Sequence, residues 1–263
     1  YVASGEGLQR PDLSVGDGIY KSSDGGKTWI NTGLKEAQQI GGLAIDPKNE
    51  NIVFAAALGH PYGANEERGV YKTIDGGKTW QRVLYKDENT GAIQVTIDPN
   101  NSNIVYADLW AGRQGPWENG AWNGKESGLF KSTDGGANWA ATTGQPTSGW
   151  ASAQGWYALA CAVNPADPNQ CIVGGLDNFK TSDGGATWTK ISAWVGTSGQ
   201  YVHADQHTSI WYDNGNKMLF GCDGGIFYSS DGGVTSRDRN VGLRLKEFYS
   251  CAIHPTLTNY FLA

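Results

Sequence analysis

Short apolar segments, each followed by a turn sequence, succeed one another along the whole chain. Three pairs of segments share one pattern, in which a segment ending in proline is followed four or five residues later by a second apolar segment. Each pair predicts two strands joined by a tight turn. No long apolar run has the 3.6-residue period of a helix, so the pattern predicts an almost entirely β structure. The paired segments are 44–47 with 51–55, 96–99 with 103–107, and 162–165 with 170–174.

A second motif returns five times and alternates with these paired strands. Its form is Ser/Thr-x-Asp-Gly-Gly-x-Thr-Trp, and the last copy ends in Ser236 where the others have Trp. The copies follow one another at intervals of 48 to 59 residues. A repeat of that size is typical of propellers, solenoids and arrays. The aspartates of the five copies are Asp24, Asp75, Asp134, Asp183 and Asp231.

This motif predicts a hairpin turn. Its two glycines supply positive φ angles without steric cost, and the Asp side chain can accept hydrogen bonds from amides of its own turn. The Ser or Thr two residues earlier adds a further local bond, and the closing Trp carries apolar area that a neighbouring sheet would bury. Five near-identical copies cannot all form one active site, so we interpret these aspartates as structural.

Combined, the two motifs predict four-stranded antiparallel blades of a β-propeller, with strands A to D in chain order and A innermost. The fold class is therefore all-β, and we expect residues 1–263 to form a single domain. Four blades are expected at 39–84, 91–142, 155–191 and 206–240. Residues 1–32 supply strands B, C and D of a fifth blade.

Two interpretations of the C-terminal segment remain open. Residues 247–255 have the pattern of a lone A strand, which would complete the first blade and close a five-bladed ring without an exposed edge. However, residues 259–263 have the pattern of another B strand, whose place in the first blade is already filled by residues 1–4. The chain would then belong to a propeller of six to eight blades.

Composition and charge exclude several classes of function. The 263 residues include 38 Gly and 11 Trp, and only 17% are charged, which suits many short strands and tight turns. No apolar stretch is long enough to span a membrane. The net charge is −6 and the 20 basic residues are scattered, so we expect no nucleic acid partner.

The cysteines favour no metal site. Cys161, Cys171, Cys222 and Cys251 do not have the spacing of metal ligands, and we expect no cofactor. Cys161 and Cys171 fall on the two strands of one expected hairpin, where either a disulfide or a pair of buried thiols would fit.

The repeated motif resembles the Asp-box, or BNR, repeat of sialidases, xyloglucanases and sortilin-type receptors. On this resemblance the chain is similar to secreted bacterial BNR-repeat proteins of the sortilin-like and glycosyl hydrolase-like kind. The resemblance implies a β-propeller that is secreted, extracellular or held at the bacterial cell surface. It identifies a scaffold rather than a reaction, so function must be argued from a site.

Three long loops between strands B and C are the expected ligand-binding region, because loops on a rigid scaffold often carry function. They contain exposed aromatic residues next to arginines, which suits a sugar ring or a peptide. The alternative is that the tryptophans pack each loop against its neighbour. The candidate ligand-binding residues, including two from the start of blade 155–191, are Arg10, His60, Arg68, Arg113, Trp117, Trp122, Trp156 and Tyr157.

The run from His203 to His207 is the sharpest local cluster. If extended, it would project His203, Asp205 and His207 to one side, because side chains alternate along a strand. Two imidazoles and a carboxylate suit a transition metal or acid–base chemistry. The alternative is a polar belt that seals the central channel. Asp177 and Asp223 complete the set of catalytic candidates, together with Asp205 and His207.

Three functions are compatible with these features. The interpretation we favour from sequence is an extracellular binding or scaffold propeller that recognises a glycan or a protein on its loop face. The alternative is a glycoside hydrolase, sialidase-like or xyloglucanase-like, with its site at the channel mouth; it would require paired carboxylates or a Tyr nucleophile. A third possibility is a subunit or assembly factor of a larger protein complex.

Overall fold

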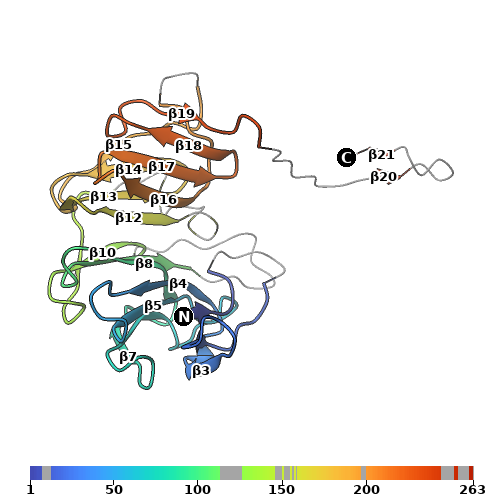
Figure 1. The fold of residues 1–263 in the computed structure, drawn as a ribbon, viewed down its shortest axis with the longest axis vertical. Helices are drawn as coiled ribbons and strands as arrows, with labels where there is room; N and C mark the ends of the chain where they lie inside the picture. Colours follow the sequence, from blue (N-terminus) through green and yellow to red (C-terminus); the bar gives the residue numbers. More distant parts are fainter. Residues whose placement is uncertain are drawn as a thin grey trace.

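The computed structural model contains the predicted all-β fold, built from consecutive antiparallel sheets (Figure 1). It describes residues 1–7, 13–112, 126–145, 150, 155, 157, 159–196 and 200–243, together with the strand residues 252–253 and 261–262. Within these residues the only helix is a single 3-10 turn, Lys35–Ala37. The sheets are called blades one to five in chain order.

Four of the five blades have four strands, and their strand order follows the chain. Blade one contains β1 (Val2–Ala3), β2 (Ile19–Lys21) and β3 (Ile30–Gly33). Blade two contains β4 (Ile40–Ile45), β5 (Val53–Ala57), β6 (Gly69–Thr73) and β7 (Gln81–Leu84). Blade three contains β8 (Thr90–Ile97), β9 (Val105–Ala111), β10 (Gly128–Ser132) and β11 (Ala140–Ala141). Blade four contains β12 (Ala160–Asn164), β13 (Asp167–Gly174), β14 (Asn178–Thr181) and β15 (Thr189–Lys190). Blade five contains β16 (Gln206–Tyr212), β17 (Lys217–Cys222), β18 (Gly225–Ser229) and β19 (Arg237–Asp238).

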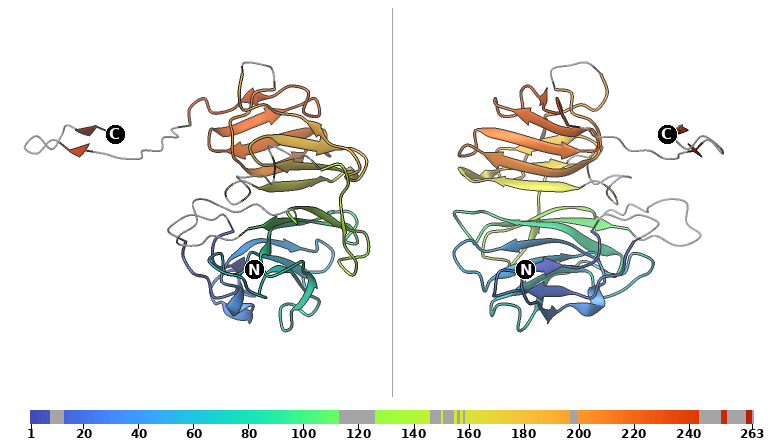
Figure 2. Two further views of the ribbon diagram at one scale, coloured as in Figure 1. Left: turned by 180° about the vertical axis from the view of Figure 1, so that it is seen from behind. Right: turned by 45° about the vertical axis from the view of Figure 1, so that its right-hand side comes forward.

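The blades stack face to face, so the hydrophobic core is divided into layers between them. The first strands β4, β8, β12 and β16 lie next to one another along the inner edge. Figure 2 shows the same stack from two further sides. Four apolar clusters fill the spaces between successive blades; for example, Phe54 and Val70 of blade two pack against Val95 and Phe130 of blade three. Each blade therefore depends on its neighbours for burial.

Each Asp box closes the turn between the third and fourth strands through its own side chains. In blade two, the Asp75 carboxylate accepts hydrogen bonds from the Thr79 amide (3.0 Å) and the Thr79 hydroxyl (2.6 Å). The Gly77 amide donates to the Thr73 hydroxyl at 2.9 Å, and Gly76 and Gly77 both have positive φ. The same bonds recur in the other boxes, where side-chain and backbone donors lower the pKa of Asp24, for example, to about 2.

A lysine from one blade reaches the Asp box of the next blade. Lys72 Nζ donates to the Gly135 carbonyl at 2.7 Å, and Lys180 Nζ donates to the Gly232 carbonyl at 2.7 Å. Lys21 makes the corresponding bond to Gly76 over 3.4 Å. Blade five has Tyr228 at this position of its third strand. We call this lysine-to-carbonyl contact the interblade bond.

The two C-terminal strands pair with each other and not with blade one. Blade one remains three-stranded, and β20 (Ala252–Ile253) pairs with β21 (Phe261–Leu262) in a separate two-stranded sheet. Pairing within this local hairpin replaces the long-range pairing that ring closure would require. This pairing favours the second interpretation, in which β20 is an A strand and β21 is the B strand of the same blade.

The described cysteines are free thiols. Cys161 and Cys171 are buried on the paired strands β12 and β13, with their sulfur atoms 3.5 Å apart. This matches the buried-thiol alternative. Cys251 lies outside the described residues.

Candidate functional site

The central candidate site lies where β16 begins, at the end of blade five opposite its Asp box. Asp205 precedes this strand with a φ of +64°, a left-handed conformation that is uncommon for a residue other than glycine. The Gln206 amide donates to the Gly175 carbonyl of blade four at 2.8 Å, and its side chain donates to the His203 carbonyl at 2.6 Å. These bonds fix the entry into the strand.

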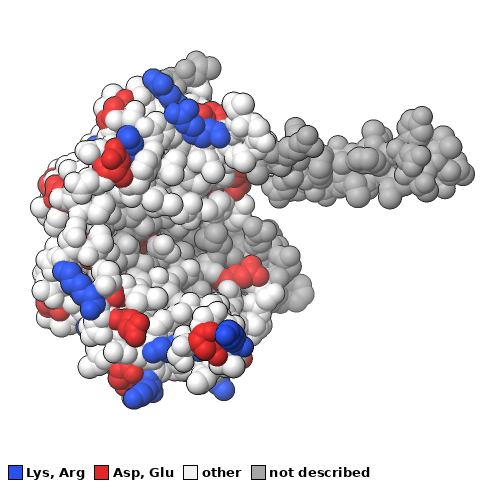
Figure 3. Space-filling view, viewed as in Figure 1, with Lys and Arg blue, Asp and Glu red and all other residues white. Residues whose placement is uncertain are grey.

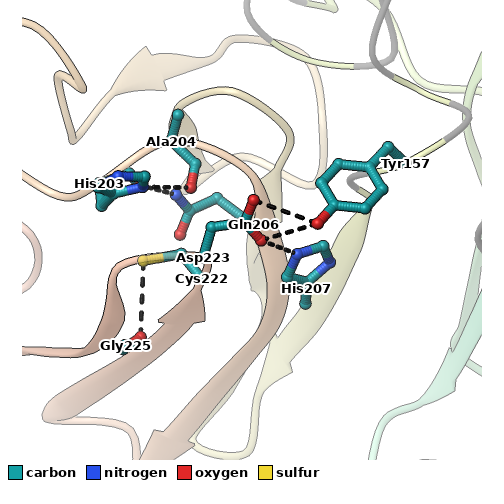
Figure 4. A network of polar contacts seen from close by, with 8 residues as sticks. All are labelled: Tyr157, His203, Ala204, Gln206, His207, Cys222, Asp223 and Gly225. Carbon is teal, nitrogen blue, oxygen red and sulfur yellow. Dashed lines mark hydrogen bonds and ion pairs between the residues drawn. The ribbon is translucent and has the colours of Figure 1, made fainter. Parts of the chain in front are cut away.

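This backbone geometry corrects the expectation that His203, Asp205 and His207 project to one side. The alternation of side chains holds only for extended backbone, and Asp205 is not extended. Figure 4 shows His203 and His207 on opposite sides of Gln206. His203 Nδ1 instead lies 3.2 Å from the carbonyl of its neighbour Ala204. Among the residues that the structure describes, no three His, Cys, Asp or Glu side chains gather as metal ligands would.

Asp223 is the centre of the polar cluster (Figure 4). It lies in the turn between β17 and β18, at the same end of the blade as Asp205. Its Oδ1 atom lies 2.6 Å from His207 Nε2, and the Tyr157 hydroxyl donates to its two oxygens at 3.1 and 3.2 Å. The Tyr157 ring also meets the His207 ring edge-to-face, with centroids 5.0 Å apart. Blades four and five thus jointly hold one carboxylate.

Asp205 lies in a different environment from Asp223. Burial, followed by the nearby charge of Asp223, raises the pKa of Asp205. Its Oδ1 atom is buried and has no hydrogen-bond partner in the described structure. The Asp223 side chain, by contrast, is 28% exposed and accepts the bonds from Tyr157 and His207. The two carboxyl groups therefore differ in their hydrogen-bond partners.

Asp177, the remaining catalytic candidate, has a structural role in blade four. Its carboxylate forms an ion pair with Lys190 Nζ at 2.7 Å and accepts a hydrogen bond from the Trp194 amide at 3.0 Å. The side chain is 5% exposed. These contacts connect the turn after β13 to the segment after β15.

Arg68, an expected ligand-binding residue, lies inside the protein. The residue is completely buried, and its guanidinium donates to the carbonyls of His60 (2.8 Å), Gly63 (3.2 Å) and Gly112 (3.1 Å). It therefore holds the long loop of blade two against blade three. His60 takes part in the same loop, and its Nε2 atom lies 2.7 Å from the Glu36 carbonyl.

Tyr157 is the one aromatic candidate that the structure places in the cluster. The other expected ligand-binding residues lie outside the described residues. These are Arg10, Arg113, Trp117, Trp122 and Trp156.

Asp108 is an unusual acid that the sequence analysis did not single out. It lies on β9, fully buried, and burial raises its pKa well above the ordinary value. Neither carboxyl oxygen has a hydrogen-bond partner in the described structure. The signal was present, because Asp108 interrupts the apolar sequence between Tyr106 and Trp110. A buried, unpaired carboxyl group is expected to be protonated.

The surface around these blades carries charges of both signs. Figure 3 shows lysine and arginine interspersed with aspartate and glutamate over the face in view. No described helix is long and apolar enough to cross a membrane.

Comparison with known proteins supports the propeller and relates it to carbohydrate-active enzymes. The Sortilin-Vps10 family model, described as "Sortilin, neurotensin receptor 3", matches residues 17–154. A xyloglucanase from Paenibacillus sp is 27% identical over 268 residues, covering 89% of this chain and 24% of the relative. A xyloglucanase from Hypocrea jecorina is 28% identical over 175 residues, covering 56% of this chain and 19% of the relative.

Solved structures have the same fold at low sequence identity. An ancestral GH74 enzyme has a TM-score of 0.64 and 16% identity, covering 91% of this chain and 30% of its own. The GH74 enzyme of Niastella koreensis has a TM-score of 0.58 and 18% identity, over 92% and 37% of the two chains. YCF48 bound to D1 peptide has a TM-score of 0.51 and 14% identity, over 86% and 62%. The chain spans about a quarter of the length of the Paenibacillus relative.

Proposed function

The chain belongs to the Sortilin-Vps10 family of Asp-box β-propellers, and from this starting point we propose that it is a glycoside hydrolase acting on a xyloglucan-like polysaccharide. The similarity to xyloglucanases extends over most of the chain and supports a glycoside hydrolase-like propeller. This replaces the binding or scaffold function that the sequence alone favoured.

The pair Asp205 and Asp223 is the observation that carries the proposal. Hydrolysis of a glycosidic bond commonly uses one carboxylic acid that donates a proton and one carboxylate on the other side of the bond. The raised pKa of Asp205 suits the proton donor, because such a group keeps its proton closer to neutral pH. The contacts of Asp223 with His207 and Tyr157 suit a second carboxyl group that is held in a fixed position.

In the proposed reaction, Asp205 protonates the glycosidic oxygen as its bond to the anomeric carbon breaks. Asp223 takes a proton from the water molecule that attacks this carbon, so that the products are two sugar fragments with free hydroxyl groups. His207 and Tyr157 position the Asp223 carboxylate through their hydrogen bonds. The Tyr157 ring adds an aromatic surface beside the pair, and aromatic faces pack well against sugar rings. A polysaccharide substrate would place this activity outside the cell, because such polymers do not cross membranes.

The test is the release of reducing ends from xyloglucan by the purified protein. We expect measurable release, and we expect Asp205→Asn and Asp223→Asn each to reduce kcat by about 100-fold or more, because each removes one partner of the pair. Asp213→Asn is the matched control. It changes an exposed aspartate at the other end of the same strand, where it pairs with Lys217.

Three results would contradict the proposal. The first is that no reducing ends are released from xyloglucan or from a panel of plant, algal and bacterial glycans and sialosides. The second is that release persists in both Asp205→Asn and Asp223→Asn. The third is that Asp213→Asn loses as much activity as these two variants. Retention of a glycan in affinity electrophoresis without release would identify a binding module instead.

A further inference from the structure

The outward face of blade five is exposed, whereas the same face of the preceding blades is covered. Ile226 lies on this face, three residues before the serine of its Asp box, and is 41% exposed. The residues at the same position in blades two, three and four are completely buried; they are Val70, Leu129 and Asn178.

The neighbouring strand of blade five repeats this contrast. Leu219 lies opposite Tyr228 and is only partly buried. Its equivalents, each opposite the lysine that directly precedes the Asp box, are Phe54, Tyr106 and Ile172, with exposures of 1%, 0% and 0%. Ile210, opposite Leu219 on β16, is 49% exposed. An apolar surface of this kind on a propeller blade is the surface that the next blade covers.

The β20–β21 hairpin has the pairing register of the first two strands of a blade. In blade two Ile45 pairs with Val53, and in blade three Ile97 pairs with Val105. In the C-terminal hairpin Ile253 pairs with Phe261, with the same separation along the chain. All three segments also share two residues. Each has a proline two residues after the isoleucine and an asparagine four residues after that proline.

We propose that the β20–β21 hairpin docks on the exposed face of blade five as the first two strands of a sixth blade. The sequence spacing, the pairing register and the exposed apolar positions all fit this occupant. The docked hairpin would continue the stack by the same face-to-face contact that already joins blades one to five. It would also place a second inner strand beside β16, next to the Asp205–Asp223 pair, without changing the residues of that pair.

Hydrogen exchange of the full chain tests this docking. Strand amides that are paired and covered exchange slowly, whereas those of an isolated hairpin exchange rapidly. We expect peptides containing β20 and β21 to exchange at least about tenfold more slowly than the same segment in a synthetic peptide of residues 244–263. Ile226→Asp, which places a charge on the exposed face, should remove this protection.

The control is Ile74→Asp. Ile74 is 69% exposed in the Asp box of blade two, so this change should leave the hairpin protected. Ile210→Asp serves as a second variant on the docking face, in case Ile226→Asp unfolds blade five. Exchange in the native chain as fast as in the peptide would overturn the proposal. Dimers in light scattering that dissociate in Ile226→Asp would also overturn it, because a second copy would then cover the face.

Discussion

At the residue scale, the environment of Asp205 depends on a single backbone angle. The left-handed φ turns its side chain out of the alternation of β16, so that one carboxyl oxygen is buried without a partner and lies near Asp223. A glycine would adopt this angle more readily. The presence of aspartate there is consistent with a chemical role for its side chain.

The pKa of Asp205 provides a residue-scale prediction. Burial is the largest cause of its increase and the charge of Asp223 is the second. Asp223→Asn removes that charge, so Asp205 should titrate at a lower pH than in the native protein, while remaining above its ordinary value because burial persists. His207→Ala should shift it the other way, because His207 lowers this pKa. Carboxyl ¹³C NMR over a pH series measures both shifts; unchanged titration in both variants would contradict the assigned coupling.

Arg68 shows why some site residues could not be predicted from sequence. Its place in a long polar loop suggested exposure, but three backbone carbonyls distributed over blades two and three surround its guanidinium. Burial of this kind depends on contacts between segments that are distant in sequence. The hydrogen bond from Tyr157 to Asp223 could not be predicted for the same reason, although the sequence analysis named Tyr157 as a ligand-binding candidate and Asp223 as a catalytic one.

At the element scale, the Asp-box hairpins were predictable because their determinants are local. The donors, acceptors and positive-φ glycines of each turn lie within a few residues of one another. The interblade bond was not predicted, although the lysine precedes every box but the last. Its acceptor is a carbonyl 52 to 63 residues further along the chain.

The interblade bond predicts a stability change. Lys72→Met keeps most of the side-chain volume but leaves the Gly135 carbonyl without its charged donor. We expect the free energy of unfolding to fall by about 1–2 kcal/mol, lowering Tm by about 2–8 °C. Lys78→Met, at an exposed position in the Asp box of the same blade, should leave Tm unchanged. Thermal unfolding followed by circular dichroism measures both; equal Tm values for the two variants would show that this bond contributes nothing.

At the scale of the whole molecule, the repeated Asp boxes predict acid sensitivity. Their hydrogen bonds lower the pKa of Asp24, Asp134 and Asp231 to about 2, below the ordinary value of 3.8. Because the folded-state pKa is the lower one, this stabilisation is complete above about pH 4 and is lost as the pH falls towards 2. Tm should therefore be steady down to about pH 4 and then decline. Replacing all three residues by Asn should lower Tm at pH 7 and flatten the decline, whereas Glu36→Gln with Glu50→Gln should do neither.

The global arrangement was predictable in part. The repeat period and the two hairpin motifs predicted the blades and their strand order, because every blade is built from contacts close in sequence. Ring closure and a larger propeller were both compatible with the sequence; in the structure, Ile253 pairs with Phe261 within its own hairpin rather than with blade one. Sequence periodicity identifies the repeating unit, but it does not determine which edges meet in space.

The interblade bond also has an evolutionary consequence. Its donor lysine and its acceptor glycine occur in the same repeat, so each ordinary blade carries both halves of the joint. A tandem duplication of one blade would insert a copy that matches both of its new neighbours without further mutation. Chains of this kind can therefore gain or lose whole blades at little cost to packing. Among the described blades, blade five differs in that Tyr228 stands in the place of the donor lysine.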